Sequence, residues 1–380
     1  MPAQSILQIV SGFKPSVDGM GDFARRLGDA LHRHSGIRSH FLVYRAPKTG
    51  FDSDKIREEI QPNTLSYAAA ATPAAEAEAI AELLHNRGFD CALIHYGPYG
   101  YSSVGEPAAF VALIEELARN LPVLVFFHET YASGKLWERA FWTNPQQRSS
   151  MSRLLEAAQV SFTSNAKYML RLETMSRTGR PPVKIPIFSN IGEPANLRPL
   201  QERPRQLVIF GQLVTRIRLY REQRQTLEAI CGKLRIESVI DVGSGKSDHI
   251  PATLAGIAVQ SRGWMDEDSL SRLMADSIAG IIGYWPDVWE KSGVLAAYQA
   301  HALVPILVEL EPRHIPAPSY LPYILPEEVL RLTGKENSVS DAVLQKIADA
   351  SHAYYMQYQS VNRCAEVIAA SAAQGVASET

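Results

Sequence analysis

The sequence predicts an α/β protein with two domains, each built on a parallel sheet that helices cover on both faces. Three observations support this prediction. The chain has 380 residues, which is long for a single hydrophobic core. Short apolar runs alternate with segments whose apolar residues recur at helical spacing, as in parallel strands connected by helices. The alternation stops at 191–206, a segment with three prolines and no periodicity that is typical of a linker, and then starts again.

The apolar runs before this linker predict the strands of an N-terminal domain, residues 1–195. We expect strands at 6–10, 39–45, 91–96, 122–128, 160–164 and 183–188. Apolar residues three or four positions apart predict helices at 23–34, 73–87 and 106–119.

The second series predicts a domain at 196–345, followed by a helical segment at 346–380. Strands are expected at 207–211, 238–243, 256–263, 278–284 and 304–310. Helices are expected at 219–233, 266–276 and 292–300, and the tail is helical from about 340 to 373. Ligands of open parallel sheets bind beyond the carboxyl ends of the strands, so a two-domain version of this fold would place its site in a cleft.

Charge and cysteine content narrow the classes of function. A formal net charge of −2 gives no global attraction to nucleic acid or to acidic membranes. Three scattered cysteines, Cys91, Cys231 and Cys364, fit a reducing compartment better than a disulfide framework. The N-terminus lacks the pattern of a signal peptide, and no apolar run approaches the ~18 residues of a spanning helix. We therefore expect a cytoplasmic protein without a nucleic-acid partner.

The first loop raises a functional question. The stretch SGFKPSVDGMGDFARRLGDAL (11–31) follows the apolar run ILQIV, and Gly19 and Gly21 stand just before the expected helix. A third glycine at the spacing of a dinucleotide-binding fingerprint is missing. Asp22 is a candidate for the helix cap, so a plain turn and cap explains the stretch. The alternative is a bare backbone and a helix N-terminus that approach an anionic ligand.

DGMGDFARRLGDAL resembles the GG(I/M)GDYARRLAEAL-like stretch of retaining glycosyltransferases of the GT-B fold, family 4-like. The resemblance implies an α/β fold with two Rossmann-like domains facing a central cleft, and a C-terminal helix that returns to the first domain. It implies a hexosyltransferase that retains the anomeric configuration, needs no metal or cofactor, and takes a UDP- or GDP-linked sugar as co-substrate. The first domain would then be the acceptor side and the second would bind the nucleotide sugar. Gly21 would lie at the donor phosphates, and Gly19 and Asp22 on the acceptor side.

Two further motifs of the first domain extend the resemblance. VLVFFHETY (123–131) matches a strand that ends in a histidine and an acid, which would place His128 near the transferred sugar and Glu129 on the acceptor side. Taken alone, His128 fits a structural histidine. KIPIFSNIGEP (184–194) resembles the family's V-x-V-I-P-N-G-V-D stretch, so Ser189, Asn190 and Gly192 would line a hinge, although a simple turn also explains them.

In the second domain, IFGQLVTRIRLYREQRQTLEAI resembles the family's VGRL…KG…LLEA stretch, where an arginine and a lysine bind the donor diphosphate. Gln212 occupies the position of that arginine. Arg216 and Arg218 lie nearest in register and would stabilise the charge that develops on the leaving diphosphate. A solvated helix face is the alternative explanation of these arginines.

GIIGYWPDVWEKSGVLAAYQAHALVPILV (280–308) resembles the family's P-x-x-x-E-x-F-G-x-x-x-x-E motif. Glu290 would contact the hydroxyls of the donor sugar as a catalytic residue, and the amides of Ser292 and Gly293 would meet its phosphates. Tyr298 replaces the second glutamate, which commonly holds the ribose. SRGWMDEDSLSRLM (261–274) would place Gly263 and Trp264 beside the base.

The remaining motifs have simpler explanations. DSD (52–54) and DED (266–268) precede helical patterns and fit caps better than a metal site. GSGKSD (243–248) is an incomplete P-loop and fits a turn, and no histidine or cysteine spacing indicates a metal. KLWERAFW (135–142) is more typical of a core than of a surface for a lipid-linked or aromatic acceptor.

The sequence is compatible with three functions. The leading one is sugar transfer to a glycan, a lipid-linked molecule or a small molecule, with a peripheral membrane contact left open. The loss of the motif arginine and glutamate favours a second, a catalytically degenerate scaffold partner. The third is another enzyme of two Rossmann-like domains, such as an epimerase or a phosphorylase.

Overall fold

The computed structural model describes residues 4–12, 19–45, 64–68, 88–331 and 338–377. The chain forms two compact units. Unit 1 comprises Met1–Pro186 together with Val361–Thr380, and unit 2 comprises Ile187–Ser360. The chain thus leaves unit 1 after Pro186 and returns to it at Val361, whereas the sequence-based division is at residues 195 and 345.

Unit 1 contains a seven-stranded parallel sheet with the order β3-β2-β1-β4-β5-β6-β7. Its strands are β1 (Ser5–Val10), β2 (Arg38–Arg45), β3 (Thr64–Ala68), β4 (Cys91–Tyr96), β5 (Val123–Phe127), β6 (Val160–Thr163) and β7 (Val183–Lys184). All residues of β1, β4 and β5 are buried, as their continuous apolar runs predict for strands covered on both faces. The strand order reverses between β1 and β4, which is the point where open parallel sheets bind ligands.

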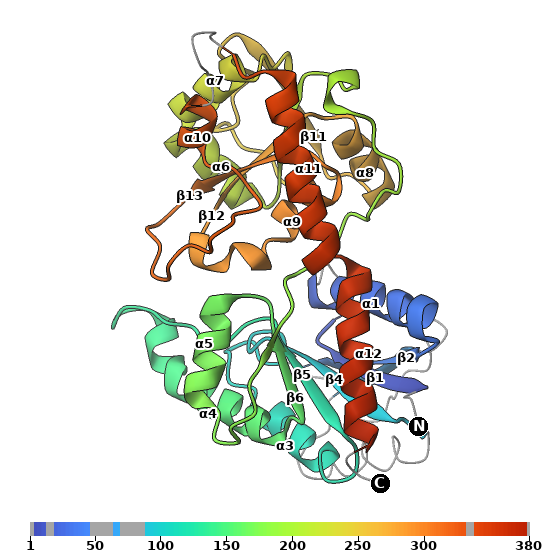
Figure 1. Cartoon of the computed structure of the whole chain (residues 1–380). Helices are drawn as coiled ribbons and strands as arrows, with labels where there is room; N and C mark the ends of the chain where they lie inside the picture. Colours follow the sequence, from blue (N-terminus) through green and yellow to red (C-terminus); the bar gives the residue numbers. More distant parts are fainter. Residues whose placement is uncertain (1–3, 13–18, 46–63, 69–87, 332–337, 378–380) are drawn as a thin grey trace. The chain divides into compact units, whose positions relative to one another are not determined.

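The helices of unit 1 lie on both faces of this sheet (Figure 1). They are α1 (Gly19–Ser35), α3 (Ala108–Leu117), α4 (Arg139–Ala157), α5 (Ala166–Met175) and α12 (Val361–Ala377). Helix α1 packs against α12, so the C-terminal helix returns to the first domain as expected, and α3 packs against α4. Strand β3 and helices α4 and α5 were not predicted from sequence, and the helix expected at 73–87 lies outside the described residues.

Unit 2 contains a six-stranded sheet with the order β10-β11-β9-β8-β12-β13. Its strands are β8 (Gln206–Phe210), β9 (Ser238–Val242), β10 (Thr253–Leu254), β11 (Ile257–Gly263), β12 (Ala279–Tyr284) and β13 (Val304–Glu309). The neighbours from β11 to β13 pair in parallel, and β10 pairs with β11 antiparallel. Here the strand order reverses between β8 and β12, so the carboxyl ends of these strands flank the equivalent ligand-binding point.

The helical segments of unit 2 are η1 (Leu200–Glu202), α6 (Leu213–Glu222), α7 (Arg224–Lys233), α8 (Glu267–Ala275), η2 (Pro286–Lys291), α9 (Gly293–Ala300), α10 (Pro326–Arg331) and α11 (Asp341–Tyr358). The helix expected at 219–233 is wrong in extent, because helix already begins at Leu213 and breaks at Gln223. Gln223 has φ −122° and ψ 24°, a conformation outside the helical region that ends α6 and starts α7. Strand β10 and helix α10 were also not predicted from sequence.

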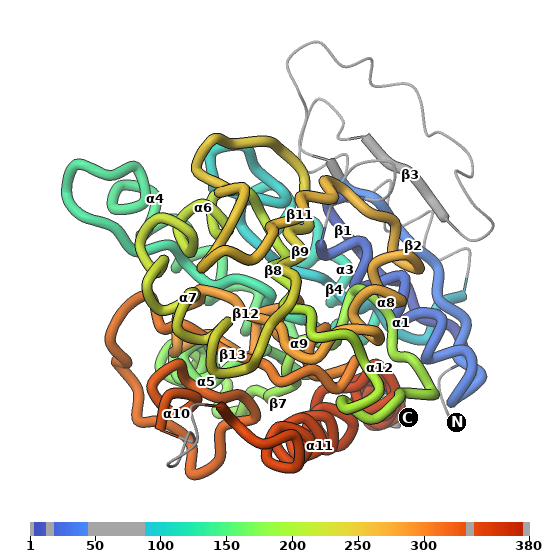
Figure 2. Tube along the Cα trace, turned by 90° about the horizontal axis from the view of Figure 1, so that it is seen from above, coloured from blue at the N-terminus to red at the C-terminus, as the bar shows by residue number. Residues whose placement is uncertain are grey.

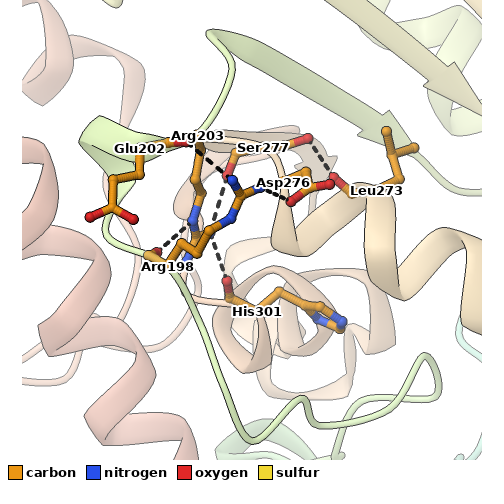
Figure 3. A network of polar contacts seen from close by, with 7 residues as sticks. All are labelled: Arg198, Glu202, Arg203, Leu273, Asp276, Ser277 and His301. Carbon is orange, nitrogen blue, oxygen red and sulfur yellow. Dashed lines mark hydrogen bonds and ion pairs between the residues drawn. The ribbon is translucent and has the colours of Figure 1, made fainter.

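The second half of the 191–206 linker is anchored to unit 2 by a buried arginine (Figure 3). The Nη1 atom of Arg203 donates to the carbonyl oxygens of Ser277, at 3.1 Å, and of His301, at 3.0 Å. Its Nε atom donates to the carbonyl of Arg198, which forms an ion pair with Asp276. One guanidinium thus satisfies carbonyls at the ends of two helices, α8 and α9, that have no partner within those helices.

The segment that enters α4 protrudes from unit 1 (Figures 1 and 2). Four of its apolar side chains are exposed: Leu136, Trp137, Phe141 and Trp142. The sequence-based preference for a core at this position is therefore wrong. Among the described residues, the helices are all too short or too polar to span a bilayer.

Candidate functional site

In unit 1 the carboxyl ends of β4 and β5 lie beside the first turn of α1. A Cβ atom on Gly100 would lie 2.6 Å from the Met20 side chain and 2.8 Å from the Ser11 hydroxyl, so the loop after β4 packs directly on this turn. A Cβ atom on Gly97 would lie 3.8 Å from Cγ of Glu129, which follows β5. The structure therefore brings together three stretches that are distant in sequence: the start of α1, the loop after β4 and the residues after β5.

The acceptor-side residues expected from sequence lie around this turn. Gly19 is exposed at the start of α1, and Asp22 and Glu129 are half-buried. Gly21, which was expected at the donor phosphates, is buried in the same turn. Asp22 lies in the first turn of the helix, where a carboxylate interacts favourably with the helix dipole. Because α1 begins at Gly19, Asp22 is the fourth helical residue and not the cap expected from sequence. An acid in the first turn still stabilises the helix whether or not a ligand binds.

His128 follows β5 directly and is 5% exposed. Its ring meets Phe23 of α1 edge-on, with ring centroids 4.8 Å apart, and stacks on Phe126 at 4.5 Å. Its Nε2 atom lies 3.0 Å from Nδ1 of His95, which is fully buried in β4. The ring is thus held on three sides by unit 1.

Behind His128, a chain of hydrogen bonds crosses the sheet. The Nε2 atom of His95 lies 2.8 Å from Oε1 of Gln8 in β1, and the Gln8 amide donates to the Ser39 hydroxyl in β2 at 2.9 Å. Burial lowers the pKa of His95 to about 3, so this imidazole is neutral at ordinary pH. With its Nε2–H donated to Gln8, His95 accepts on Nδ1, and His128 is then the donor through Nε2–H.

His95 and Gln8 were not selected from the sequence. The signal that could have identified them is one polar side chain inside each of the apolar runs CALIHY and SILQIV. A buried polar side chain needs a partner, and strands β1 and β4 are neighbours.

In unit 2 two glycine loops meet beyond the ends of β8 and β9. Gly211 has φ +140° and Gly243 has φ +146°, conformations that other residues rarely adopt. A Cβ atom on Gly243 would lie only 2.2 Å from the carbonyl oxygen of Gly211. The Gly243 amide donates to the carbonyl of Gly263 at 2.8 Å, which adds the end of β11 to the same group. Gly263 therefore lies beside the loops at Gly211 and Gly243, and the adjacent Trp264 is 71% exposed.

Arg216 holds these loops from inside the unit. It is 2% exposed, its Nε donates to the Gly211 carbonyl at 3.0 Å, and its Nη2 donates to the Ser244 carbonyl at 2.8 Å. Its Nη1 forms a buried ion pair with Asp241. Burial raises the pKa of the Asp241 carboxyl, and the neighbouring guanidinium opposes this shift. This differs from the expected contact with a donor diphosphate, because three protein acceptors already bind the guanidinium.

Arg218 lies on the outer face of α6. Its Nε donates to the Glu222 carboxylate at 2.9 Å, one helical turn along, and both side chains are more than a third exposed. Solvent-exposed pairs of this kind contribute little to stability, so Glu222 is an easily displaced partner. The solvated helix face, the alternative explanation of this arginine, describes its position in the structure.

The segment after strand β12, which comprises η2 and the start of α9, contains three further candidate residues: Glu290, Ser292 and Gly293. Glu290, in η2, is 5% exposed, and its carbonyl accepts from the Ile187 amide at 2.9 Å. The Ser292 hydroxyl caps α9 by accepting from the Leu295 amide at 3.1 Å, and Gly293 is the first helical residue. Beside Gly293 lies Asn190, whose Nδ2 atom would be 3.8 Å from an added Cβ, so part of the expected hinge lies at this helix start.

Tyr298 lies inside unit 2 rather than at its edge. It is fully buried, and its hydroxyl accepts from the Phe210 amide at 3.0 Å and lies 3.2 Å from the Val208 carbonyl. A Cβ atom on Gly280 would lie 2.5 Å from the tyrosine ring, so this glycine makes room for it. The expectation of a ribose contact is therefore at odds with this placement, because the hydroxyl bonds to strand β8 instead.

The arrangement favours anionic oxygen in unit 2 and hydroxyl recognition in unit 1. Bare glycine loops and a helix N-terminus offer backbone N–H groups to phosphate. In unit 1, His128 and nearby carboxylates offer hydrogen-bonding groups suited to hydroxyls. In the part of the chain that the structure describes, no three His, Cys, Asp or Glu side chains are placed to hold a metal ion.

No known protein-family model and no curated protein matches the chain. Its structure is nevertheless similar to solved glycosyltransferases over the whole length. An α-glucosyltransferase in complex with UDP-glucose and DNA containing an abasic site has a TM-score of 0.59 and 13% identity, covering 96% of this chain and 98% of that chain. An α,α-trehalose 6-phosphate synthase from Burkholderia multivorans has a TM-score of 0.56 and 11% identity, covering 100% of both chains.

A third similar structure is the lipopolysaccharide outer core galactosyltransferase WaaB, with a TM-score of 0.55 and 9% identity, covering 99% of this chain and 100% of that chain. These similarities confirm the predicted α/β class and the GT-B fold with two Rossmann-like domains.

Proposed function

We propose that this protein is a GT-B glycosyltransferase that moves a sugar from a UDP- or GDP-linked donor to an acceptor, with retention and without a metal. The observation that carries the proposal is structural similarity over the whole chain to glycosyltransferases, one of them solved with UDP-glucose. The positions of the selected polar residues, at the carboxyl ends of parallel strands, support it.

Donor binding is assigned to unit 2. The loops at Gly211 and Gly243 let a diphosphate approach the backbone, and Ser292 and Gly293 offer the N-terminus of α9. Glu290 would hold hydroxyls of the sugar. Gly263 and Trp264 would contact the base at the end of β11.

The charge that develops on the leaving diphosphate requires a cation. Arg216 is assigned a positioning role, because it holds the Gly211 and Ser244 carbonyls in place. Arg218 is the first candidate for the contact itself, since exchange of Glu222 for a phosphate costs little. Lys246, exposed in the loop that Arg216 holds, is the second candidate.

Acceptor binding is assigned to unit 1, with Gly19, Asp22 and Glu129 around the start of α1. Gly21 is assigned to the donor phosphates and His128 to a hydroxyl of the transferred sugar. One similar α-glucosyltransferase was solved in complex with DNA, whereas the net charge of −2 argues against a nucleic-acid acceptor here. Glycans, lipid-linked and small-molecule acceptors therefore come first, and duplex DNA belongs in the same panel.

Thermal-shift measurements with UDP, GDP, ADP and TDP and their sugar conjugates test the donor site. We expect one nucleotide to raise the melting temperature, and Arg218→Ala to lose most of this rise. Arg221→Ala is the matched control, because Arg221 also contacts Glu222 and is more exposed. Lys246→Ala distinguishes the second candidate. A flat response to every nucleotide would refute the proposal.

A catalytically degenerate scaffold is the second candidate function. The placement of Arg216 and Tyr298 favours it, since both side chains bond to their own unit instead of facing outward. This function predicts no stabilisation by any nucleotide sugar. It also predicts no release of nucleotide in the presence of the acceptor panel.

A further inference from the structure

The protruding segment that comprises the residues before α4 and the first turns of that helix carries an unusual concentration of exposed aromatic residues. We call residues 133–145 the aromatic turn. The exposed fractions are 60% for Leu136, 79% for Trp137, 42% for Phe141 and 64% for Trp142. Single exposed apolar residues are common on soluble proteins, but four within seven positions on a protrusion indicate a contact surface (Figure 2).

Basic side chains accompany these aromatic rings. Lys135, Arg139 and Arg148 are exposed in and beside the turn, and Glu138 is the only acid between 132 and 150. The Lys135 ammonium lies 5.4 Å from the centroid of the Trp137 ring. This local excess of positive charge contrasts with the formal charge of −2 on the whole chain.

The polar groups of the turn are bonded within it. The Trp142 indole N–H donates to the Leu136 carbonyl at 3.0 Å. The Lys135 amide donates to Glu138 at 2.9 Å, and the Asn144 side chain donates to the Ala132 carbonyl at 2.6 Å. Removing these groups from water therefore costs less free energy than removing unpaired polar groups.

A hollow of about 490 Å³ opens between Ser133 and Gly134, which precede α4, and residues in the first turns of that helix. It is lined by Ser133, Gly134, Phe141, Trp142, Asn144 and Pro145. An apolar wall with a few polar groups at its rim suits a molecule that is apolar at one end and polar at the other.

We propose that the aromatic turn binds the interface of a bilayer that contains anionic lipids. Tryptophan prefers the boundary between headgroups and acyl chains, because its ring is apolar and its N–H polar. Lysine and arginine add attraction to anionic headgroups. The combination on one small, internally bonded protrusion favours a lipid interface over a protein partner, since protein interfaces are generally larger and depleted in lysine.

The test uses the full-length protein, without donor or acceptor, so its result is independent of the proposed enzymatic function. Flotation is measured with vesicles of phosphatidylcholine alone and of phosphatidylcholine with phosphatidylglycerol. We expect binding to the anionic vesicles, with a blue shift of tryptophan emission, and weaker binding to the neutral ones.

Variants locate the contact. Trp137→Ser combined with Trp142→Ser should weaken vesicle binding at least about tenfold, and Lys135→Ala combined with Arg139→Ala roughly 30-fold. Trp137→Ser alone avoids loss of the Trp142 hydrogen bond and should show part of the effect. Trp264→Ser is the matched control, because Trp264 is equally exposed and lies in unit 2.

Three results would overturn the proposal. The first is absence of binding to either vesicle, and the second is equal loss of binding in the Trp264→Ser control. The third is concentration-dependent self-association that the tryptophan variants abolish without any vesicle binding, which would identify a second copy as the occupant. Circular dichroism of each variant verifies that it is folded.

Discussion

The Nε2 atom of His128 lies 3.0 Å from the Nδ1 atom of His95, a residue 33 positions earlier in the chain. Because His95 is neutral and donates to Gln8, this contact makes His128 Nε2 a hydrogen-bond donor. In the neutral ring, Nδ1 is then the acceptor. A strand-end histidine thus acquires one defined tautomer from residues in β1 and β4.

Replacing Gln8 should disturb this tautomer without unfolding the protein. Gln8→Leu removes the acceptor of His95 Nε2–H, so His95 no longer has a fixed orientation of donor and acceptor. We expect long-range ¹H–¹⁵N spectra to show His128 as the Nε2–H tautomer in the wild type and as a mixture in the variant. For the enzyme proposed here, kcat should fall about tenfold with little change in the donor KM. A wild-type spectrum with the Nδ1–H tautomer would contradict the assignment.

Acid should destabilise the protein through two buried histidines. Burial lowers the pKa of His95 to about 3 and that of His301 to about 4, from an ordinary value of 6.5. At a pH between its folded-state pKa and 6.5, each histidine binds a proton in the unfolded chain but not in the folded chain. The free energy of unfolding therefore decreases as the pH falls below about 6.5. Each histidine contributes a slope of up to about 1.4 kcal/mol per pH unit.

The histidine variants test this pH dependence by urea unfolding from pH 7 to pH 4. His95→Gln can still hydrogen-bond to both Gln8 and His128, so it should reduce the slope while keeping most of the stability at pH 7. His301→Gln should do the same for unit 2. The exposed His34→Gln is the control, and an unchanged slope in His95→Gln would show that His95 binds its proton as readily in the folded state as in the unfolded state.

Tyr298 should be a stabilising residue that nucleotide binding does not require. Tyr298→Phe leaves the buried Phe210 amide without its acceptor and should cost about 1–3 kcal/mol of unfolding free energy. Gly280→Ala forces a Cβ into the tyrosine ring and should cost at least a similar amount. Calorimetry would show unchanged affinity of Tyr298→Phe for the nucleotide found by thermal shift. A large loss of affinity with little loss of stability would restore the ribose role expected from sequence.

The Arg216–Asp241 pair should show strong coupling in a double-mutant cycle. Arg216→Met leaves a buried carboxylate unpaired and should cost about 3–5 kcal/mol, and Asp241→Leu leaves a buried guanidinium unpaired at a similar cost. The double variant should recover much of the loss, because neither charge remains buried alone. Additive losses in denaturant unfolding would instead mean that each side chain contributes by itself.

Single substitutions of Arg216 also distinguish a positioning role of this residue from direct binding of the donor. If Arg216 only holds the Gly211 and Ser244 carbonyls, nucleotide affinity should fall less in Arg216→Lys than in Arg216→Met, because lysine can still reach one of them. Equal loss in both, with stability restored in the double variant, would indicate a direct contact with the donor.

Regular patterns determined much of the fold in advance. Strands β1, β4 and β5 are predominantly apolar runs, and both ends of each strand were predicted within one residue. Helix α4 was not, because its sequence RAFWTNPQQRSSMSRLLEA contains Pro145 and many polar residues in its first half. Its buried positions become apolar only from Met151 onward, so periodicity is weak where the helix begins.

The sequence by itself determined the alternation of strands and helices and the linker between the two series, since these follow from local patterns along the chain. His128, Glu290 and Ser292 were selected because their motifs resemble those of GT-B glycosyltransferases. Only the tertiary structure decided which polar side chains bind other parts of the protein and which face the solvent. Arg216 and Arg218 are two positions apart on α6, yet one is buried against Asp241 and the other pairs with Glu222 in water. The physical reason is that the environment of a side chain depends on what packs opposite it. For Arg216 that is strand β9, 25 residues further along the chain.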